Sequence, residues 1–240
     1  MEQLRLDKLL AATGRWSRRK AKELIREGRV TVDGRPPRSP EEKLDPAAAR
    51  VTVDGEALQY EKYTYVMLHK PAGLLSATED SRAATVLDLL PPELGKRGLF
   101  PVGRLDKDTE GLLLLTNHGE LAHRLLSPRH HVDKVYFAQV QGELEQADVE
   151  RFAGGIVLQD GLVCLPARLE ILAPDQALVT VQEGKFHQVK RMLASCGKPV
   201  LRLKRLSMGP LTLDETLEAG QWRFLTEQEI RLLEEKTGQG

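Results

Sequence analysis

Strand and helix patterns follow one another in an irregular order from Tyr65 to the end of the chain, and this order narrows the possible folds most. Apolar stretches of strand length occur at 65–69, 99–102, 112–116, 135–140, 167–172, 177–181 and 200–203, and helical spacing occurs at 85–90, 120–126, 146–152, 186–196 and 226–235. A doubly wound sheet would need strands and helices in regular alternation. The sequence therefore predicts an α+β fold with a mixed, largely antiparallel sheet flanked by helices.

A separate small unit is predicted before this region. Apolar residues from Leu6 repeat at helical spacing up to Gly14, and Ser17 is a typical N-cap for a second helix that ends near Gly28. Two short alternating strands follow at 29–32 and 50–53, each leading into an Asp-Gly turn. We expect a first domain over residues 1–60, a short linker within 56–64, and a second domain over 64–240.

The net charge is zero, with 35 basic and 35 acidic residues, but the charges are unevenly distributed. Residues 1–38 hold eleven Lys or Arg against five Asp or Glu, and residues 184–213 hold seven Lys or Arg and no acid. A polyanion responds to local charge, so two basic zones can bind it within a neutral molecule. The alternative is that both zones are solvated faces without a ligand.

Several classes of protein are disfavoured by what the sequence lacks. The longest strongly apolar run, 112–115, is too short to cross a bilayer, and the first residues show no apolar signal core, so we expect a cytoplasmic protein. The phosphate-binding and serine-hydrolase motifs are missing, and we expect no cofactor. His130 and His131 are adjacent, but no third metal ligand has a useful spacing, so no metal is expected either.

The loop at residues 100–111 carries the densest functional signal. It places three acids, two bases and two glycines between two apolar strands. The acids could bind a divalent cation, or act as a pair in general acid–base catalysis, or a single carboxylate could act beside Arg104, which would keep it ionised. A charged surface loop without chemistry is the fourth possibility, and the residues alone leave all four open.

The first 60 residues carry a resemblance to a known module. The string LRLDKLLAATGRWSRRKAKELIREGRVTVDG, starting at Leu4, resembles the S4 RNA-binding module. The resemblance implies that basic side chains of this unit contact RNA phosphates, which position RNA without reading its sequence. The expected contacts are Arg5, Lys8, Arg18, Arg19, Lys22 and Arg26.

The remainder of the chain resembles the RsuA-like branch of the pseudouridine synthases. The loop and its following strand, VGRLDKDTEGLLLLTNHG, resemble the catalytic motif of that family, and four further motifs occur in the family's order at 69–73, 134–136, 183–192 and 201–211. The resemblance implies isomerisation of uridine to pseudouridine in ribosomal RNA. This reaction breaks the bond from ribose C1′ to N1 and forms a bond to C5, and it needs no cofactor.

The resemblance also implies roles for individual residues. Asp106 would act at the sugar, Lys190 would pair with it, and Tyr136 would stack on the uracil and could relay the C5 proton. The target uridine would be flipped out of the RNA, and Arg104 would fill the vacated stack or hold the adjacent phosphate. Further RNA contacts are expected at His187, Arg191, Arg202 and Lys204, with His187 and Arg191 turned away from the buried stripe of a helix over 186–196. Asp108 and Glu110 are expected to shape the loop.

The segment at 127–131 resembles the small-subunit enzymes of this branch more than the large-subunit ones. The expected partner is therefore 16S ribosomal RNA or an assembling small-subunit particle, bound by a monomer without membrane contact. Two alternatives remain. The chain could modify large-subunit 23S RNA, or it could be a non-catalytic RNA-binding or ribosome-assembly protein on the same scaffold.

Overall fold

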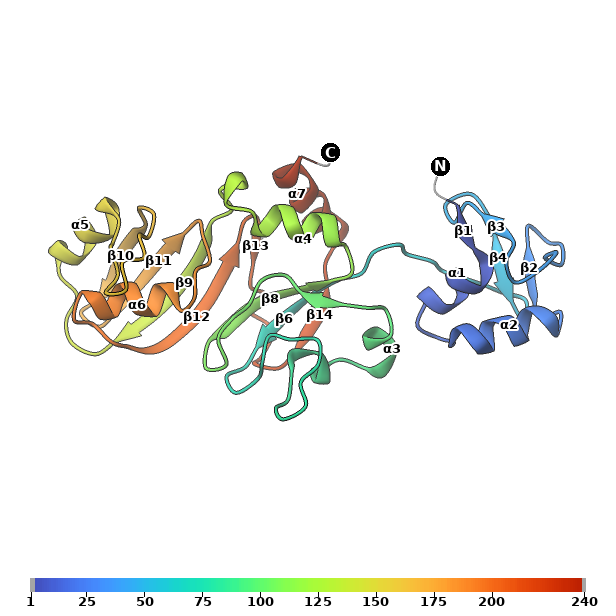
Figure 1. Ribbon diagram of the computed structural model, residues 1–240, viewed down its shortest axis with the longest axis horizontal. Coiled ribbons are helices and arrows are strands. Elements are labelled where there is room, and N and C mark those ends of the chain that lie inside the picture. The colour runs from blue at the N-terminus through green and yellow to red at the C-terminus, as the bar shows by residue number, and fades with distance from the viewer. Residues whose placement is uncertain (1–2, 239–240) are drawn as a thin grey trace. The chain divides into compact units, whose positions relative to one another are not determined.

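The computed structural model describes residues 3–238, with the side chain of Pro128 excepted (Figure 1). Internal contacts divide these residues into two compact units, one formed by residues up to 64 together with 90–99, the other by 65–89 together with the residues from 100 onward. Each unit is described by itself. Among the described residues, no helix is both long enough and apolar enough to cross a membrane.

The N-terminal unit packs two helices on small sheets. Its elements are β1 (Leu4–Arg5), α1 (Leu6–Ala12), α2 (Arg18–Arg26), β2 (Val30–Val32), β3 (Lys43–Leu44), β4 (Val51–Val53), β5 (Glu56–Ala57) and the single turn α3 (Pro92–Gly95). Leu6, Leu10 and Leu24 are at most 1% exposed, so the apolar faces of α1 and α2 form its core. The predicted N-cap is confirmed, because Ser17 Oγ accepts a hydrogen bond of 3.2 Å from the Lys20 backbone N–H.

The two Asp-Gly turns adopt the conformation that their sequence favours. Asp33 and Gly34 have φ values of 52° and 77°, and Asp54 and Gly55 have 53° and 85°. Consecutive left-handed residues are typical of tight hairpin turns, where Asp tolerates and Gly readily adopts a positive φ. The two predicted strands beside them are present as β2 and β4, which pair antiparallel with Val30 opposite Val53.

The second unit is organised around one large sheet. Its strands are β6 (Tyr65–Lys70), β7 (Phe100–Pro101), β8 (Glu110–Thr116), β9 (Lys134–Val140), β10 (Arg168–Ala173), β11 (Gln176–Val181), β12 (Val200–Met208), β13 (Leu211–Thr212) and β14 (Trp222–Phe224). The order is β10-β11-β9-β12-β8-β6-β14, with β13 beside β12 and β7 beside β8. Among the named strands of the described residues, only β12 and β8 pair in parallel, so the α+β class with a mixed, largely antiparallel sheet is confirmed.

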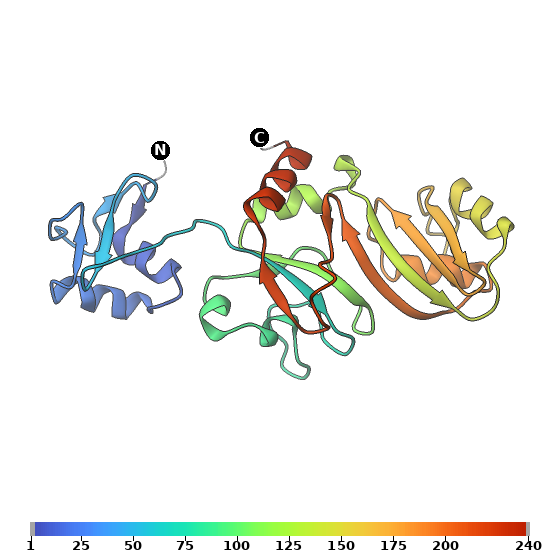
Figure 2. The same ribbon diagram turned by 180° about the vertical axis from the view of Figure 1, so that it is seen from behind.

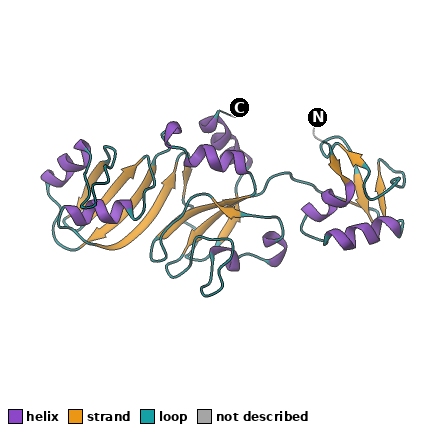
Figure 3. Cartoon of the chain, viewed as in Figure 1, coloured by secondary structure: helices purple, strands orange, loops and turns teal. Residues whose placement is uncertain are grey.

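Helices cover this sheet in two groups (Figures 2 and 3). Its helical elements are η1 (Val86–Leu89), α4 (Gly119–Leu126), η2 (Pro128–His130), α5 (Gln146–Gly154), α6 (Gln188–Ser195) and α7 (Glu227–Thr237). The helices α5 and α6 bury Phe152 and Met192 against the β9–β12 half of the sheet, and α4 contacts α7. A hydrogen bond of 2.8 Å from Arg124 Nη1 to the Thr237 carbonyl joins these last two helices.

Four predicted elements differ from the structure. The expected strand at 200–203 continues to Met208 as β12. The expected helix at 85–90 is a short 3₁₀ helix, because the prolines that follow at 91 and 92 disfavour α-helical backbone before them. The expected strand at 99–102 shrinks to β7, and Pro101 supplies no N–H for further pairing. The expected helix at 186–196 begins only at Gln188, with consequences for the site described below.

Gly111 fixes the junction of β8 and β12. It lies opposite Arg205 in the parallel pair with φ of 106°, and a Cβ there would lie 2.2 Å from the Arg205 carbonyl oxygen. Only glycine permits both this backbone conformation and this approach. The loop that precedes β8 is thereby held against β12.

Candidate active site

Asp106 lies in the loop between β7 and β8 and lines a pocket in the second unit. The other walls come from Tyr136 on β9, Leu203 on β12 and the segment 183–189 that leads into α6. The carboxylate side chain is 25% exposed, so it is shielded by protein yet open to a ligand. The loop that stood out in the sequence therefore supplies one wall of a pocket.

Lys190 is the cation closest to Asp106. Its Nζ lies 3.1 Å from Asp106 Oδ2 and 2.5 Å from Asp108 Oδ1. Burial alone would lower the pKa of Lys190, but hydrogen bonds and charge attraction from both carboxylates outweigh burial and raise it above its usual value. The hydrogen bond from Lys190 in turn lowers the pKa of Asp108. The side chain expected to pair with Asp106 does so, and it also binds a second acid of the loop.

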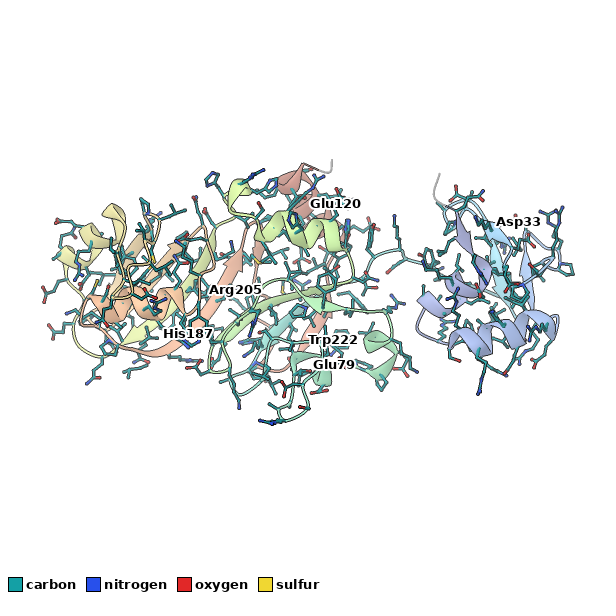
Figure 4. The ribbon with its side chains drawn as sticks, in the orientation of Figure 1. Asp33, Glu79, Glu120, His187, Arg205 and Trp222 are labelled. Carbon is teal, nitrogen blue, oxygen red and sulfur yellow. The ribbon has the colours of Figure 1, made fainter. Side chains whose placement is uncertain are left out.

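His187 occupies a position that the helical projection did not predict. Its φ and ψ are 50° and 32°, so it lies in the left-handed region immediately before α6 and not within the helix. Its Nε2 consequently lies 3.4 Å from Asp106 Oδ1, where a regular helix over 186–196 would have turned it away (Figure 4 labels His187 at the start of α6). Left-handed backbone at a residue other than glycine is uncommon and is concentrated at functional sites.

The segment before α6 is fixed by a buried acid. Glu183 Oε1 accepts hydrogen bonds from Gln188 Nε2 at 2.7 Å and from the Leu165 backbone N–H at 2.9 Å, and Glu183 Oε2 lies 2.9 Å from Lys185 Nζ. The side-chain carbonyl of Gln188 accepts a further bond of 3.0 Å from the Lys185 N–H. These contacts hold the backbone that carries His187 and Lys190.

A second lysine, which is fully buried and which the sequence interpretation missed, holds the backbone of the loop. Lys70 at the end of β6 is 0% exposed, and its Nζ donates to the carbonyl oxygens of Asp106, Lys107 and Thr109 at 3.1, 3.3 and 2.9 Å. Burial lowers the pKa of Lys70 to about 8 although three nearby carboxylates oppose the shift. The only signal in the sequence was its place in the His69-Lys70-Pro71 motif.

Ser76, which lies outside the loop, also fixes its backbone. Ser76 Oγ donates to the Leu105 carbonyl at 2.9 Å and accepts from the Leu105 N–H at 3.1 Å. The residue before Asp106 is thus fixed through both of its backbone polar groups. Beyond it, the buried hydroxyl of Thr109 lines the pocket and has no hydrogen-bond partner among the described residues.

The structure brings together five residues that were predicted to act on or contact the substrate. Arg104, Asp106, Tyr136 and His187 line one pocket, and Lys190 contacts Asp106 directly. Arg191 and Arg202 are engaged by carboxylates, at 2.6 Å from Asp160 and 2.8 Å from Glu110 respectively. Glu110 therefore holds a cation of β12, in agreement with a role in shaping the loop. Lys204 is half-buried on β12, opposite Phe137.

In the N-terminal unit, one buried acid gathers several of the predicted RNA-binding cations. Asp7 is 0% exposed, and its carboxylate lies 3.0 Å from Arg5, 3.5 Å from Arg18 and 3.8 Å from Lys22. Burial raises the pKa of Asp7, but the hydrogen bond and charge of Arg5, with the other two cations, outweigh burial and lower it overall. Glu41 also lies 2.9 Å from Arg5 and 3.4 Å from Lys22, so the three cations exceed the two acids of this cluster by one positive charge.

More of the predicted basic contacts are solvent-exposed in the same unit. Lys8, Arg19 and Arg26 are exposed, and the Arg19 side chain is 92% exposed although its Nε lies 3.9 Å from Glu23. An exposed ion pair of this length is weak and easily exchanged for a phosphate. This unit thus presents cations from both α1 and α2.

Comparisons with known proteins identify the family of both parts of the chain. A family model described as RNA pseudouridylate synthase matches residues 64–195, and the S4 domain model matches residues 4–49. An uncharacterized RNA pseudouridine synthase of Bacillus subtilis is 48% identical over 236 residues, which cover 97% of this chain and 99% of that protein. A ribosomal small subunit pseudouridine synthase A of Pseudomonas aeruginosa is 43% identical, over 95% of this chain and 99% of that protein.

A solved structure gives the same result for the fold. The crystal structure of a pseudouridylate synthase superposes with a TM-score of 0.69 at 36% identity, covering 96% of this chain and 99% of that one. The chain belongs to the RNA pseudouridylate synthase family and carries an S4 domain, so it is an enzyme of the isomerase class. Within the family, similarity over nearly its whole length extends to proteins named ribosomal small subunit pseudouridine synthase A.

Proposed function

We propose that this protein converts a specific uridine to pseudouridine in 16S ribosomal RNA, with Asp106 as the residue that acts on the ribose. The observation that carries the proposal is the position of Asp106 in a pocket between Lys190, at 3.1 Å, and His187, at 3.4 Å. The ion pair with Lys190 orients the carboxylate, which is the group that would attack the sugar or remove a proton from it.

The chemistry follows from the bonds that change. The C1′–N1 bond of uridine breaks, the uracil rotates, and C1′ bonds to C5, after which the C5 proton leaves. Asp106 either adds to C1′ or removes a sugar proton to form a glycal, and both routes require a carboxylate held at the sugar. Lys70 and Ser76 hold the backbone around Asp106, so the carboxylate is positioned before substrate binds.

Tyr136 is proposed to contact the uracil, and Arg104 the gap that the flipped-out uridine leaves in the RNA. Tyr136 lines the same pocket as Asp106, which supports stacking of its ring on the uracil and relay of the C5 proton. Arg104 is exposed at the pocket and lies two residues before Asp106, so it can reach the gap or the phosphate left by a flipped-out uridine. Arg202, Lys204 and Arg191 are proposed as weaker RNA contacts, because two of them must exchange a carboxylate for phosphate.

The choice of 16S RNA is supported by the relatives named for the ribosomal small subunit, which are 40% and 43% identical to this chain. A large-subunit 23S substrate is the alternative within the same chemistry. We further propose that residues 1–60 form the RNA-binding domain and 64–240 the catalytic domain, that the enzyme acts as a monomer, and that it works in the cytoplasm on free RNA or assembling small-subunit particles.

The proposal is tested by release of tritium from RNA labelled at uridine C5. Full-length 16S and 23S transcripts and assembling small-subunit particles are incubated with the protein, and the modified nucleotide is then mapped. Release from 16S RNA or from the particles that maps to one uridine supports the proposal. Release from 23S RNA alone would assign the protein to the alternative substrate, and tight binding without release from any RNA would show a non-catalytic protein.

A further inference from the structure

Phe186 presents its ring to solvent in an unusual way. It is 74% exposed, the highest value among the exposed large apolar side chains of the described residues. Its ring stacks on the imidazole of His187, with a centroid distance of 3.8 Å and an interplanar angle of 19°. Single aliphatic side chains exposed at a surface are ordinary, but a largely exposed aromatic ring beside a candidate catalytic pocket indicates a binding surface.

This aromatic pair is held in place. The left-handed backbone of His187 ends the loop. Gln188 Oε1 accepts a hydrogen bond of 3.0 Å from the Lys185 backbone N–H, and Gln188 Nε2 donates one of 2.7 Å to Glu183 Oε1, so these side chains brace the segment that carries Phe186. A strained conformation persists only when the surrounding contacts determine it. The exposed ring therefore belongs to a fixed segment, and a ligand that stacks on it does not have to order a loop.

The stack extends from the pocket to the surface. His187 lines the pocket and lies 3.4 Å from Asp106, while Phe186 stacks on His187 and is open to solvent. Residues 184–213 contain seven Lys or Arg and no acid, and some of these cations pair with acids from other segments, Arg191 with Asp160 and Arg202 with Glu110. An exposed aromatic ring suits the flat face of a nucleic-acid base, and cations nearby that exchange a carboxylate for phosphate suit the backbone beside that base.

We propose that Phe186 stacks on an unpaired base of the RNA that lies next to the target uridine in the chain. The inference rests on the proposed function, because extraction of a uridine leaves its neighbours without one stacking partner. Phe186 replaces that partner on the outside of the pocket while Asp106 acts inside it. A protein partner could also cover an aromatic ring, but the adjacent pocket, which would receive a uridine of the RNA, favours RNA.

The experiment uses the full-length protein and an RNA hairpin that contains the mapped uridine. Binding is measured for the wild type, Phe186→Ala, Phe186→Leu and Phe186→Trp, on intact RNA and on RNAs made abasic at each of the two nucleotides on either side of the target. Phe186→Ala and Phe186→Leu should bind intact RNA roughly tenfold more weakly, and Phe186→Trp should bind close to the wild type. Leu172→Ala on β10, which removes a side chain that is 51% exposed, is the control and should change nothing.

Non-additivity identifies the stacked base. At one position the abasic RNA should weaken binding by the wild type roughly tenfold and binding by Phe186→Ala hardly at all, because the same contact is already missing. Equal losses of affinity for the wild type and Phe186→Ala at every abasic position would overturn the inference. Binding of intact RNA by Phe186→Ala with wild-type affinity would also overturn it, and would favour a protein as the partner of the ring. Tritium release by the wild type on the intact hairpin is measured in parallel. Its absence counts against the proposed function, whereas release combined with additive losses counts against the stacking alone.

Discussion

Lys190 Nζ lies between Asp106 and Asp108, 3.1 Å from one carboxylate and 2.5 Å from the other. The two acids differ in exposure, with side chains 25% and 75% exposed, so the shielded one faces the pocket and the other faces water. One cation therefore serves two purposes. It orients the Asp106 carboxylate through an ion pair, and it connects the outer part of the loop to α6.

Replacement of Lys190 should affect catalysis more than binding. Lys190→Met removes the cation nearest the carboxylate. We expect kcat to fall by about 100-fold and KM to change less than about threefold, because the ion pair stabilises the transition state more than it stabilises the bound substrate. Lys190→Arg should retain much of the activity. Lys236→Met on α7 is the matched control. A rise in KM with kcat unchanged would make Lys190 a phosphate contact.

Asp108 should matter less than Asp106 despite its shorter contact with Lys190. Asp108→Asn leaves the Asp106–Lys190 pair in place, and a largely exposed ion pair contributes about 1 kcal/mol or less to stability. We expect a fall in kcat of less than about tenfold and an unchanged denaturant midpoint. A loss as large as that of an Asp106 variant would show that Asp108 takes part in the chemistry.

Lys70 should be required for the shape of the loop. Lys70→Met keeps the length of the side chain but leaves the carbonyls of Asp106 and Thr109 without their donor inside the protein, and each buried unsatisfied group costs about 1–3 kcal/mol. Urea unfolding should show a loss of about 3 kcal/mol, and tritium release should fall with it. An active variant of wild-type stability would refute this role.

Asp7 should make the stability of the protein depend on pH. Its folded pKa lies below that of the unfolded chain, about 3.9, so the stabilisation is complete above that value and is lost as pH falls through the folded pKa. The difference in free energy of unfolding between the wild type and Asp7→Asn should therefore be constant near pH 6 and shrink below about pH 4. A difference that does not change with pH would show that Asp7 contributes packing alone.

Arg19 tests the electrostatic role of the N-terminal unit. Its side chain is 92% exposed, so Arg19→Ala should leave folding intact and remove one phosphate contact. The slope of log K against log salt should decrease by about 0.7–0.9. Arg231→Ala on α7, also an exposed arginine, should leave the slope unchanged. Equal slopes for the wild type and Arg19→Ala would exclude Arg19 from the RNA interface.

Local signals account for the parts of the fold that the sequence predicted well. The Ser17 cap and the turns at Asp33 and Asp54 each depend on a few neighbouring residues, and all three are present. The loop at 100–111 stood out because it packs charges between apolar strands, and the resemblance to a known family singled out Asp106 within it. The role of Lys70 was not identifiable, because its contacts with the loop depend on the pairing of β6 with β8.

The position of His187 shows a second limit. Periodicity extended the helix back to Phe186, because periodicity reports which residues could lie on one face and not where the backbone leaves the helix. The left-handed turn is fixed by Glu183 and Gln188, whose side chains bond the preceding segment. Contacts of this kind, made by polar side chains around a pocket, decide the site geometry and leave little trace in a hydrophobic pattern.

The most direct test of the account is turnover by Asp106→Asn on the RNA that the wild type modifies. Asparagine keeps the size of the side chain and removes the charge, and Asp108→Asn is the matched control from the same loop. We predict no detectable tritium release by Asp106→Asn. Its RNA affinity should be within about twofold of the wild type, and its free energy of unfolding within about 0.5 kcal/mol. Wild-type turnover by Asp106→Asn would contradict the assignment of the catalytic residue and with it the proposed mechanism.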